Sequence, residues 1–248
     1  MAFVGTRTRR SDPSRELFAA VDSGDTARVS SLLQKSVDVN CTNSLGETPL
    51  HLASKRSNYA LMKLLCEARA DLSLATAASK STPLLLASLN TSLSAVLLLL
   101  HHRANPNDTN INGNSVLHLS ATNGSLSIAA MLLDHRADVN VGNYRNMTPL
   151  HCAAKRGRHQ MIELLIHRGA NKEALDDERQ TPLHVALDFN TAHIVATTFA
   201  SWSVERHSIA PQRVKDQIHT IMIIRSSDRD SMLTALPNEL LFLIFEAL

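Results

Sequence analysis

The chain has 248 residues, of which 44% are hydrophobic and 19% are charged, and its formal net charge is +2 at pH 7. This balance is typical of a soluble folded protein that can bury a continuous apolar core. Aromatic residues make up only 4% of the sequence and glycine occurs only 8 times, which disfavours an all-β sandwich or barrel. We therefore expect an all-α fold.

The charges and cysteines argue against several kinds of partner and cofactor. Basic and acidic residues are interspersed without a long run of like sign, and no aromatic-rich RNA-binding signature is present, so nucleic acid is not expected to be the main partner. Cys41, Cys66 and Cys152 include no close pair, which argues against a disulfide framework or a zinc site. The apolar runs AVLLLL and LLFLIF are too short to cross a membrane. We expect a cytoplasmic or nuclear protein with no cofactor.

Residues 1–14 are expected to form a disordered tail. They include the basic run RTRR at 7–10, which is either a weak nuclear-localisation signal or an ordinary solvated segment. No apolar stretch of signal-peptide length is present there.

A repeated pattern organises residues 15–202. The motif TPLH, or a close variant, begins at positions 48, 82, 115, 148 and 181, so successive starts are 34, 33, 33 and 33 residues apart. A second block begins at 37, 70, 104, 137 and 170 with VDVN, ADLS, ANPN, ADVN and ANKE. An Ala-containing segment and then a Leu-rich segment lie between the two blocks, which predicts two helices per repeat.

The first helix of each repeat is expected to begin at the TPLH motif. Thr48 and Thr148 can cap such a helix, and the proline that follows fits the first helical position, where its missing N–H is no loss. The second helix carries a leucine stripe, as at Leu61 and Leu65, which predicts a buried face.

These motifs resemble the ankyrin repeat. The resemblance covers residues 15–202 and implies an all-α ankyrin-repeat solenoid of about six helix-turn-helix repeats with a short C-terminal helical extension. Residues 15–40 lack the opening TPLH and are expected to be an atypical capping repeat, and the repeat that starts at 181 is expected to be degenerate. The resemblance implies structural hydrogen bonds, and no metal binding, for the motif histidines His51, His118, His151 and His184.

The residue before the second block departs from the ankyrin pattern. In that family it is normally glycine, which ends the second helix in the left-handed region. Here Arg69, Arg103 and Arg136 occupy the position, and Gly169 follows the pattern. Two explanations are open: the helix ends differently at these arginines, or their guanidinium groups form a ladder that contacts an acidic partner.

The exposed side chains of the first helices and the turn tips are expected to form a concave surface that binds a protein partner. The basic groups at 55–56 and 155–158 suggest an acidic stripe on that partner, although a merely solubilising role is equally open. The partner-binding candidates are Lys55, Arg56, Asn58, Asn90, Asn123, Tyr144, Arg145, Lys155, Arg156, Arg158, Glu178, Arg179 and Asp188. No phosphate loop, carboxylate pair or nucleophile–base arrangement is present, so no catalytic residue is predicted and an enzyme is not expected.

Residues 203–248 leave the repeat period and are expected to form a C-terminal helical segment. One helix is predicted at about 212–225, and LPNELLFLIFEAL at 236–248 predicts a strongly amphipathic one. The latter is similar to the opening helix of an F-box, and ankyrin proteins of the PRANC arrangement end in such a segment. The resemblance implies docking to the Skp-type adaptor of a cullin ubiquitin ligase through Leu236, Pro237, Leu240, Leu241, Ile244 and Leu248.

Two other interpretations of this segment remain open. Its length and two-helix form also resemble the SOCS box, and the helices would alternatively do no more than cap the apolar end of the repeat stack. The predicted function is therefore protein binding on the repeats. The chain would act either as a substrate receptor of a cullin-type ubiquitin ligase or as a plain ankyrin scaffold or inhibitor.

Overall fold

The computed structural model describes residues 12–186 and Thr191, and the structural statements below concern these residues. The chain divides into two compact units, Met1–Ile111 and Asn112–Leu248, called unit 1 and unit 2 here. The described residues form ten α-helices and no β-strand, as an all-α fold requires. None of these helices is long and apolar enough to cross a membrane.

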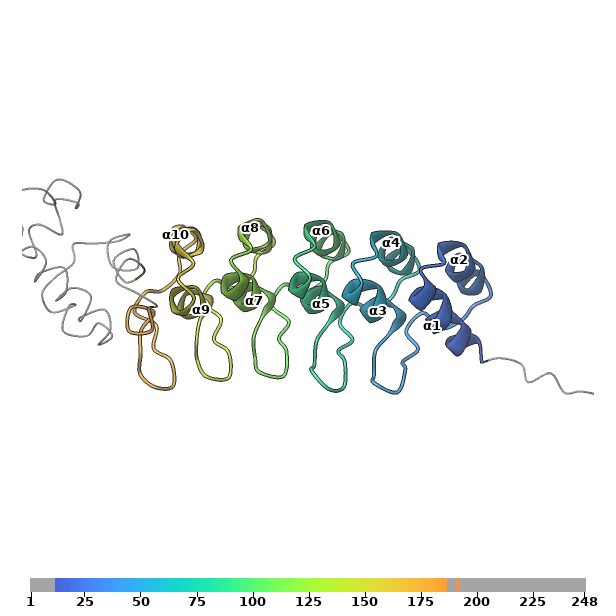
Figure 1. Ribbon diagram of the computed structural model, residues 1–248, viewed down its shortest axis with the longest axis horizontal. Coiled ribbons are helices and arrows are strands. Elements are labelled where there is room, and N and C mark those ends of the chain that lie inside the picture. Colours follow the sequence, from blue (N-terminus) through green and yellow to red (C-terminus); the bar gives the residue numbers. More distant parts are fainter. Residues whose placement is uncertain (1–11, 187–190, 192–248) are drawn as a thin grey trace, which may run out of the picture. The chain divides into compact units, whose positions relative to one another are not determined.

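Unit 1 contains three helix pairs. They are α1 (Pro13–Ser23) with α2 (Thr26–Gln34), α3 (Pro49–Lys55) with α4 (Tyr59–Glu67), and α5 (Pro83–Leu89) with α6 (Leu93–His101). The first helix of each pair contacts the first helix of the next pair, and the second helices contact one another in the same way. Figure 1 shows these two rows, with the turns that precede α3 and α5 projecting beyond the row of first helices.

Unit 2 contains two helix pairs of the same kind. They are α7 (Val116–Asn123) with α8 (Leu126–Asp134), and α9 (Pro149–Lys155) with α10 (His159–His167). Helix α7 contacts α9, and α8 contacts α10. Residues 181–186, where a sixth repeat is predicted to begin, form a turn instead of a helix, and apart from Thr191 the rest of that repeat lies outside the described residues.

Side-chain caps fix where the helices begin. The Asp12 carboxylate accepts a hydrogen bond from the backbone N–H of Ser14, so α1 starts at Pro13 and residues 13 and 14 belong to the first repeat instead of the predicted tail. Thr48 and Ser115 cap α3 and α7, and the histidine three residues later bonds back to the cap backbone. These are capping boxes in which histidine takes the usual place of glutamate.

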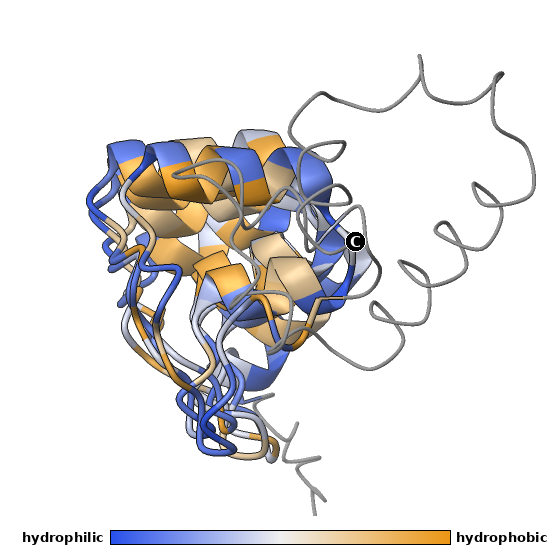
Figure 2. Ribbon diagram, turned by 90° about the vertical axis from the view of Figure 1, so that its left-hand side faces the viewer, coloured by the Kyte–Doolittle hydropathy of each residue, from blue (hydrophilic) through white to orange (hydrophobic). Residues whose placement is uncertain are grey.

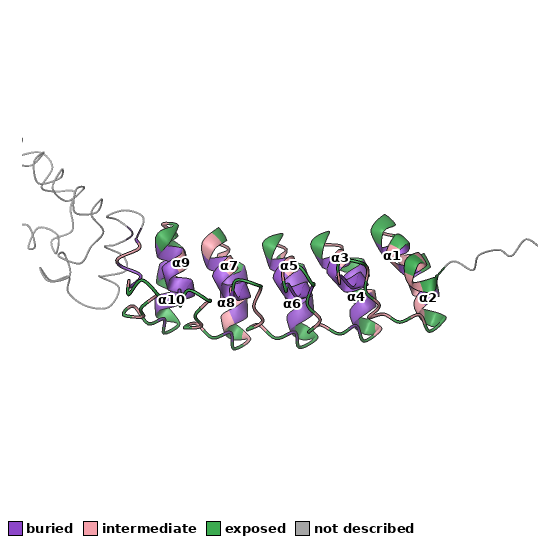
Figure 3. Cartoon of the chain, turned by 90° about the horizontal axis from the view of Figure 1, so that it is seen from below, coloured by how far each residue is buried: buried purple, intermediate pink, exposed green. Residues whose placement is uncertain are grey.

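The core of each unit lies between its two helix rows. Leucines of both rows are fully buried there, such as Leu50 and Leu65 in unit 1 and Leu117 and Leu150 in unit 2. Figure 2 shows the apolar residues of the rows facing each other while the turns are largely polar. Figure 3 shows buried residues along the middle of the helices and exposed residues at their ends. The leucine stripe is therefore buried, as its helical spacing predicts.

The second helices end in the same conformation whether or not glycine is present. The φ angles are +61° at Arg69, +68° at Arg103, +66° at Arg136 and +89° at Gly169. The residue after each, such as Ala70, donates its N–H to a carbonyl five residues back at about the usual hydrogen-bond distance, as in a Schellman motif. The explanation in which the helix ends differently at the arginines is therefore wrong.

Candidate functional site

The motif histidines fix each turn against the following repeat. In unit 1, the Nε2 atom of His51 lies 3.1 Å from the carbonyl oxygen of Ser81, and its Nδ1 atom lies 3.0 Å from the backbone nitrogen of Thr48. In unit 2, His118 Nε2 lies 2.8 Å from the Met147 carbonyl oxygen. A carbonyl accepts only and a backbone N–H donates only, so each ring is neutral with its proton on Nε2. The predicted structural role of these histidines is confirmed.

A groove of about 380 Å³ opens in unit 2 between the turns and the first helices α7 and α9. We call it the Tyr144 groove. It is lined by Asn112, Asn114, Thr122, Asn143, Tyr144, Arg145, Met147, Cys152, Lys155 and Arg156. Four of the predicted partner-binding residues, Tyr144, Arg145, Lys155 and Arg156, therefore meet in one place.

Tyr144 is held at the rim of the groove by the preceding turn. Its backbone N–H donates to the carbonyl of Asn112 at 3.2 Å. A Cβ added to Gly113 would lie 2.7 Å from the Tyr144 ring, and Gly113 itself has a φ of +74°, so the turn requires glycine on both grounds. The tyrosine nevertheless keeps 68% of its surface exposed. A fixed, exposed aromatic side chain is a common anchor in protein interfaces.

The cations of the groove are exposed, and two of them have no partner in the part of the chain that the structure describes. Arg145 makes an ion pair with Glu178 at 2.6 Å. The side chains of Lys155 and Arg156 have no hydrogen-bond or ion-pair partner among the described residues. Cys152 lies beside them, and burial raises the pKa of its thiol despite their charge, so this part of the wall is neutral at pH 7.

The basic pair of unit 1 is arranged differently. Lys55 lies 3.4 Å from the Glu47 carboxylate, and the Arg56 guanidinium bonds to the carboxylate and carbonyl of Asp22. These contacts hold together residues of the same repeat and of neighbouring repeats. Exposed ion pairs of this kind add little stability, but they neutralise the surface on which they lie.

Two of the predicted candidates in unit 1 stabilise the repeats. Asn58 caps α4 by accepting a hydrogen bond from the N–H of Leu61. The Asn90 amide donates to the carbonyls of Ser54 and Lys55 at the end of α3, at 3.3 and 2.7 Å.

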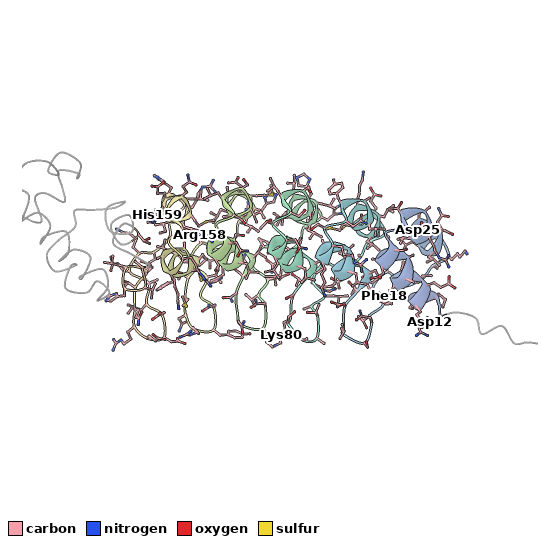
Figure 4. All side chains as sticks on the ribbon, viewed as in Figure 1. Asp12, Phe18, Asp25, Lys80, Arg158 and His159 are labelled. Atoms are coloured by element: carbon pink, nitrogen blue, oxygen red, sulfur yellow. The ribbon has the colours of Figure 1, made fainter. Side chains whose placement is uncertain are left out.

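In unit 2, Arg158 donates a hydrogen bond to a carbonyl near the end of α7, as Asn90 does at the end of α3. Its Nε donates to the Thr122 carbonyl at 3.2 Å, and its side chain lies over Gly124. Figure 4 shows Arg158 and His159 at the start of α10.

The remaining candidates lie outside the Tyr144 groove or outside the described residues. Glu178 is held by Arg145, and Arg179 occupies a left-handed position in the next turn, with a φ of +58°. Asn123 is the exposed last residue of α7. Asp188 lies outside the described residues, as do the six predicted adaptor-docking residues. Asn123, Glu178 and Arg179 are not among the residues that line the groove.

A family model described as ankyrin repeats in three copies matches residues 17–110, 74–143 and 117–197, well over half of the chain. The chain belongs to the ankyrin-repeat family. The match includes the first repeat, which lacks the TPLH motif, and it extends past the described residues into the sixth. The predicted all-α ankyrin-repeat fold is confirmed.

Two ankyrin-repeat proteins illustrate how partial the likeness to characterised chains is. The ankyrin repeat and KH domain-containing protein CBG24701 of Caenorhabditis briggsae is 38% identical over 105 residues, which is 40% of this chain and 4% of that protein. Ankyrin repeat domain-containing protein 39 of Homo sapiens is 39% identical over 59 residues, 24% of this chain and 32% of that protein. The chain therefore spans a small part of these relatives, and the likeness supports the repeats and their role in protein–protein interaction.

Several residues of the Tyr144 groove were not predicted from the sequence. Asn114, Asn143, Met147 and Cys152 line it, and none of them is charged or aromatic. An alignment of the ankyrin repeats by their 33-residue period would have identified them, because they lie in the turns and first helices that the period marks in every repeat. Among the described ankyrin repeats, no group of three or more His, Cys, Asp or Glu side chains is placed to hold a metal ion.

Proposed function

We propose that this ankyrin-repeat protein binds a segment of a protein partner in the Tyr144 groove. The observation that carries the proposal is the combination of a groove of about 380 Å³ with a 68% exposed tyrosine fixed at its rim. Interfaces obtain much of their binding energy from such aromatic anchors, and surrounding polar residues exclude water from them. The turns and first helices supply these groups on a rigid frame.

A matched pair of tyrosine variants tests the proposal. Tyr144→Ala should remove partners that the full chain captures in quantitative affinity purification. Tyr59→Ala should leave the captured partners unchanged, because Tyr59 lies at the start of α4 in unit 1 and not in the groove. Tyr59 is a suitable control since it is also an exposed tyrosine, with 46% of its surface accessible. Truncating an interface anchor typically weakens binding by about 2 kcal/mol, or roughly thirtyfold. Recovery of the same proteins with both variants would show that the groove is not the binding site.

We further propose that the chain delivers its partner to a cullin-type ubiquitin ligase. Support comes from the segment LPNELLFLIFEAL, whose Leu-Pro, acidic residue and spaced leucines are similar to the first helix of an F-box. In this proposal Leu240, Ile244 and Leu248 form the face that docks to a Skp-type adaptor. The alternative remains a plain scaffold or inhibitor whose last helices cap the repeats.

Removal of residues 230–248 distinguishes these two roles. A receptor should lose binding to a purified Skp-type adaptor while its melting temperature changes little. The milder double variant Leu236→Ala with Pro237→Ala should weaken the same binding. If the full chain does not bind the adaptor and the deletion lowers the melting temperature strongly, the segment is a cap and the receptor proposal fails.

A further inference from the structure

The same Lys-Arg dipeptide ends the first helix of two repeats. Lys55 and Arg56 end α3, and Lys155 and Arg156 end α9, one hundred positions later in the sequence. Both helices begin with a capping threonine, a proline and a motif histidine. The backbone therefore presents the two dipeptides in the same local setting.

The acids that neutralise the first dipeptide are absent from the second. Glu47 pairs with Lys55, and Asp22 pairs with Arg56. At the positions one hundred residues later stand Met147 and Thr122, which carry no charge. Both of these residues line the Tyr144 groove beside Lys155 and Arg156. Within residues 12–186, these two positive charges thus have no carboxylate partner at the groove, whereas their counterparts are paired.

We propose that the Tyr144 groove recognises an acidic segment of a protein partner, in which a carboxylate side chain stands next to an apolar one. This inference rests on the proposed function and specifies its ligand. The carboxylate would take the place that Glu47 and Asp22 have in unit 1, against Lys155 and Arg156. The exposed ring of Tyr144 and the Met147 side chain supply the apolar contact.

The shape and wall of the groove favour a peptide over nucleic acid. Its lining combines Arg145, Lys155 and Arg156 with amide, hydroxyl, thioether and thiol groups and a single aromatic ring. Single-stranded nucleic acid is bound by a continuous basic track with several stacking rings. In the same unit, the neighbouring turn contributes Asp176 and Asp177, so the positive charge does not continue beyond the groove as a track for a phosphate backbone would require. A short peptide with a local acidic group matches the limited extent of the positive charge.

The test restores in unit 2 the compensation seen in unit 1. Thr122→Asp combined with Met147→Glu keeps both cations and Tyr144 but places carboxylates beside Lys155 and Arg156. The chain already accepts these residues at the corresponding positions, because Glu47 is 8% exposed and Met147 is 9% exposed. Asn43, which donates to Glu47 at 3.0 Å, also has its counterpart in Asn143. The variant is therefore expected to fold, which a thermal melt would check.

Binding is measured by fluorescence anisotropy of the full chain with a labelled short peptide that contains two adjacent glutamates and a leucine. Its glutamine counterpart is the reference. The unmodified chain should bind the glutamate peptide about tenfold more tightly, and the double variant should lose this preference. Replacement of Lys55 and Arg56 by serine should leave the preference unchanged, because the ion pairs of unit 1 already occupy those side chains.

Each other outcome overturns the inference. Equal binding of the two peptides, or no binding of either, would show that the groove does not recognise an acidic segment. If a phosphoserine peptide or an oligonucleotide binds about tenfold more tightly than the glutamate peptide, the groove recognises phosphate instead of a carboxylate. If Tyr144→Ala still abolishes partner capture while the two peptides bind equally, the proposed function stands and only the acidic ligand is wrong.

Discussion

Arg69, Arg103 and Arg136 carry bulky side chains at φ angles between +61° and +68°. The left-handed region places Cβ close to the following carbonyl, which costs about 1 to 2 kcal/mol for a residue other than glycine. Nine residues other than glycine have positive φ in the described residues, including Thr91 at +52°. The three arginine side chains are exposed. The strain is therefore accepted at many sites because burial of the helix pairs determines the backbone.

Replacing each of these arginines by glycine should stabilise the protein. We expect about 1 kcal/mol at each site, because relief of the left-handed strain outweighs the extra unfolded-state entropy of glycine. The sites lie in different repeats, so the effects should add. Urea unfolding and thermal melts of Arg69→Gly, Arg103→Gly and Arg136→Gly measure this.

Gly169→Arg provides the matched control for these variants. A Cβ at Gly169 would meet nothing within 4 Å, so any loss of stability there reports the backbone angle alone. No gain at any of the three arginines would contradict the strain argument. The guanidinium ladder is a separate hypothesis, which loss of partner binding in the same variants would support.

At the scale of the element, histidine side chains connect successive repeats. The His51 ring joins the start of α3 to the turn before α5, and the His151 ring, through Gln180, joins the start of α9 to the next turn. Burial lowers the pKa of His51, His118 and His151 below the ordinary value of 6.5, and hydrogen bonds to backbone carbonyls oppose this only in part. A second proton on Nδ1 would face the N–H of the cap residue.

The free energy of unfolding should fall as the pH falls below about 6.5. The folded pKa of these histidines is lowered, so the unfolded chain binds more protons and is favoured at acid pH. Their contribution is complete above the unfolded pKa and is lost as the pH decreases towards the folded pKa. Each histidine adds a slope of at most about 1.4 kcal/mol per pH unit.

Urea unfolding at a series of pH values measures this slope. His118→Gln should lower stability at neutral pH and flatten the slope, because it removes one of the three groups. An unchanged pH dependence in that variant would mean that other groups cause it. Stability that rises towards acid pH would contradict the sign of the argument.

Helix ends also explain why several predicted binding residues turned out to be structural. Asn90 and Arg158 were identified as candidates because they are polar and exposed in their own repeats. In the folded chain each satisfies a terminal carbonyl of a first helix in the preceding repeat, which otherwise lacks a partner. Sequence periodicity gives the exposure of such a residue within its repeat, but not the distance of its side chain to the neighbouring one.

For the molecule as a whole, the period of the sequence was enough to predict the class of fold and the helix pairs. The TPLH motif contains the cap, the first-turn proline and the bonding histidine, so each repeat begins at a marked residue. The groove could be predicted only in part. Charge and aromatic character identified Tyr144, Arg145, Lys155 and Arg156. Met147 and Thr122 are important because they carry no charge. Their role emerges only when the carboxylates of another repeat are seen beside the same dipeptide.

The left-handed positions have a consequence for how such a surface can change. Gly46, Lys80, Gly113, Asn146 and Arg179 adopt positive φ in successive turns, although their side chains differ in size and charge. Figure 4 shows Lys80 at the tip of its turn. At Lys80, Asn146 and Arg179 the turn thus accepts side chains of different size and charge, whereas at Gly113 it leaves no room for a Cβ. A protein engineer could therefore exchange the tip residues at Lys80, Asn146 and Arg179 one at a time, keeping the geometry of each turn and altering only what it offers to a ligand.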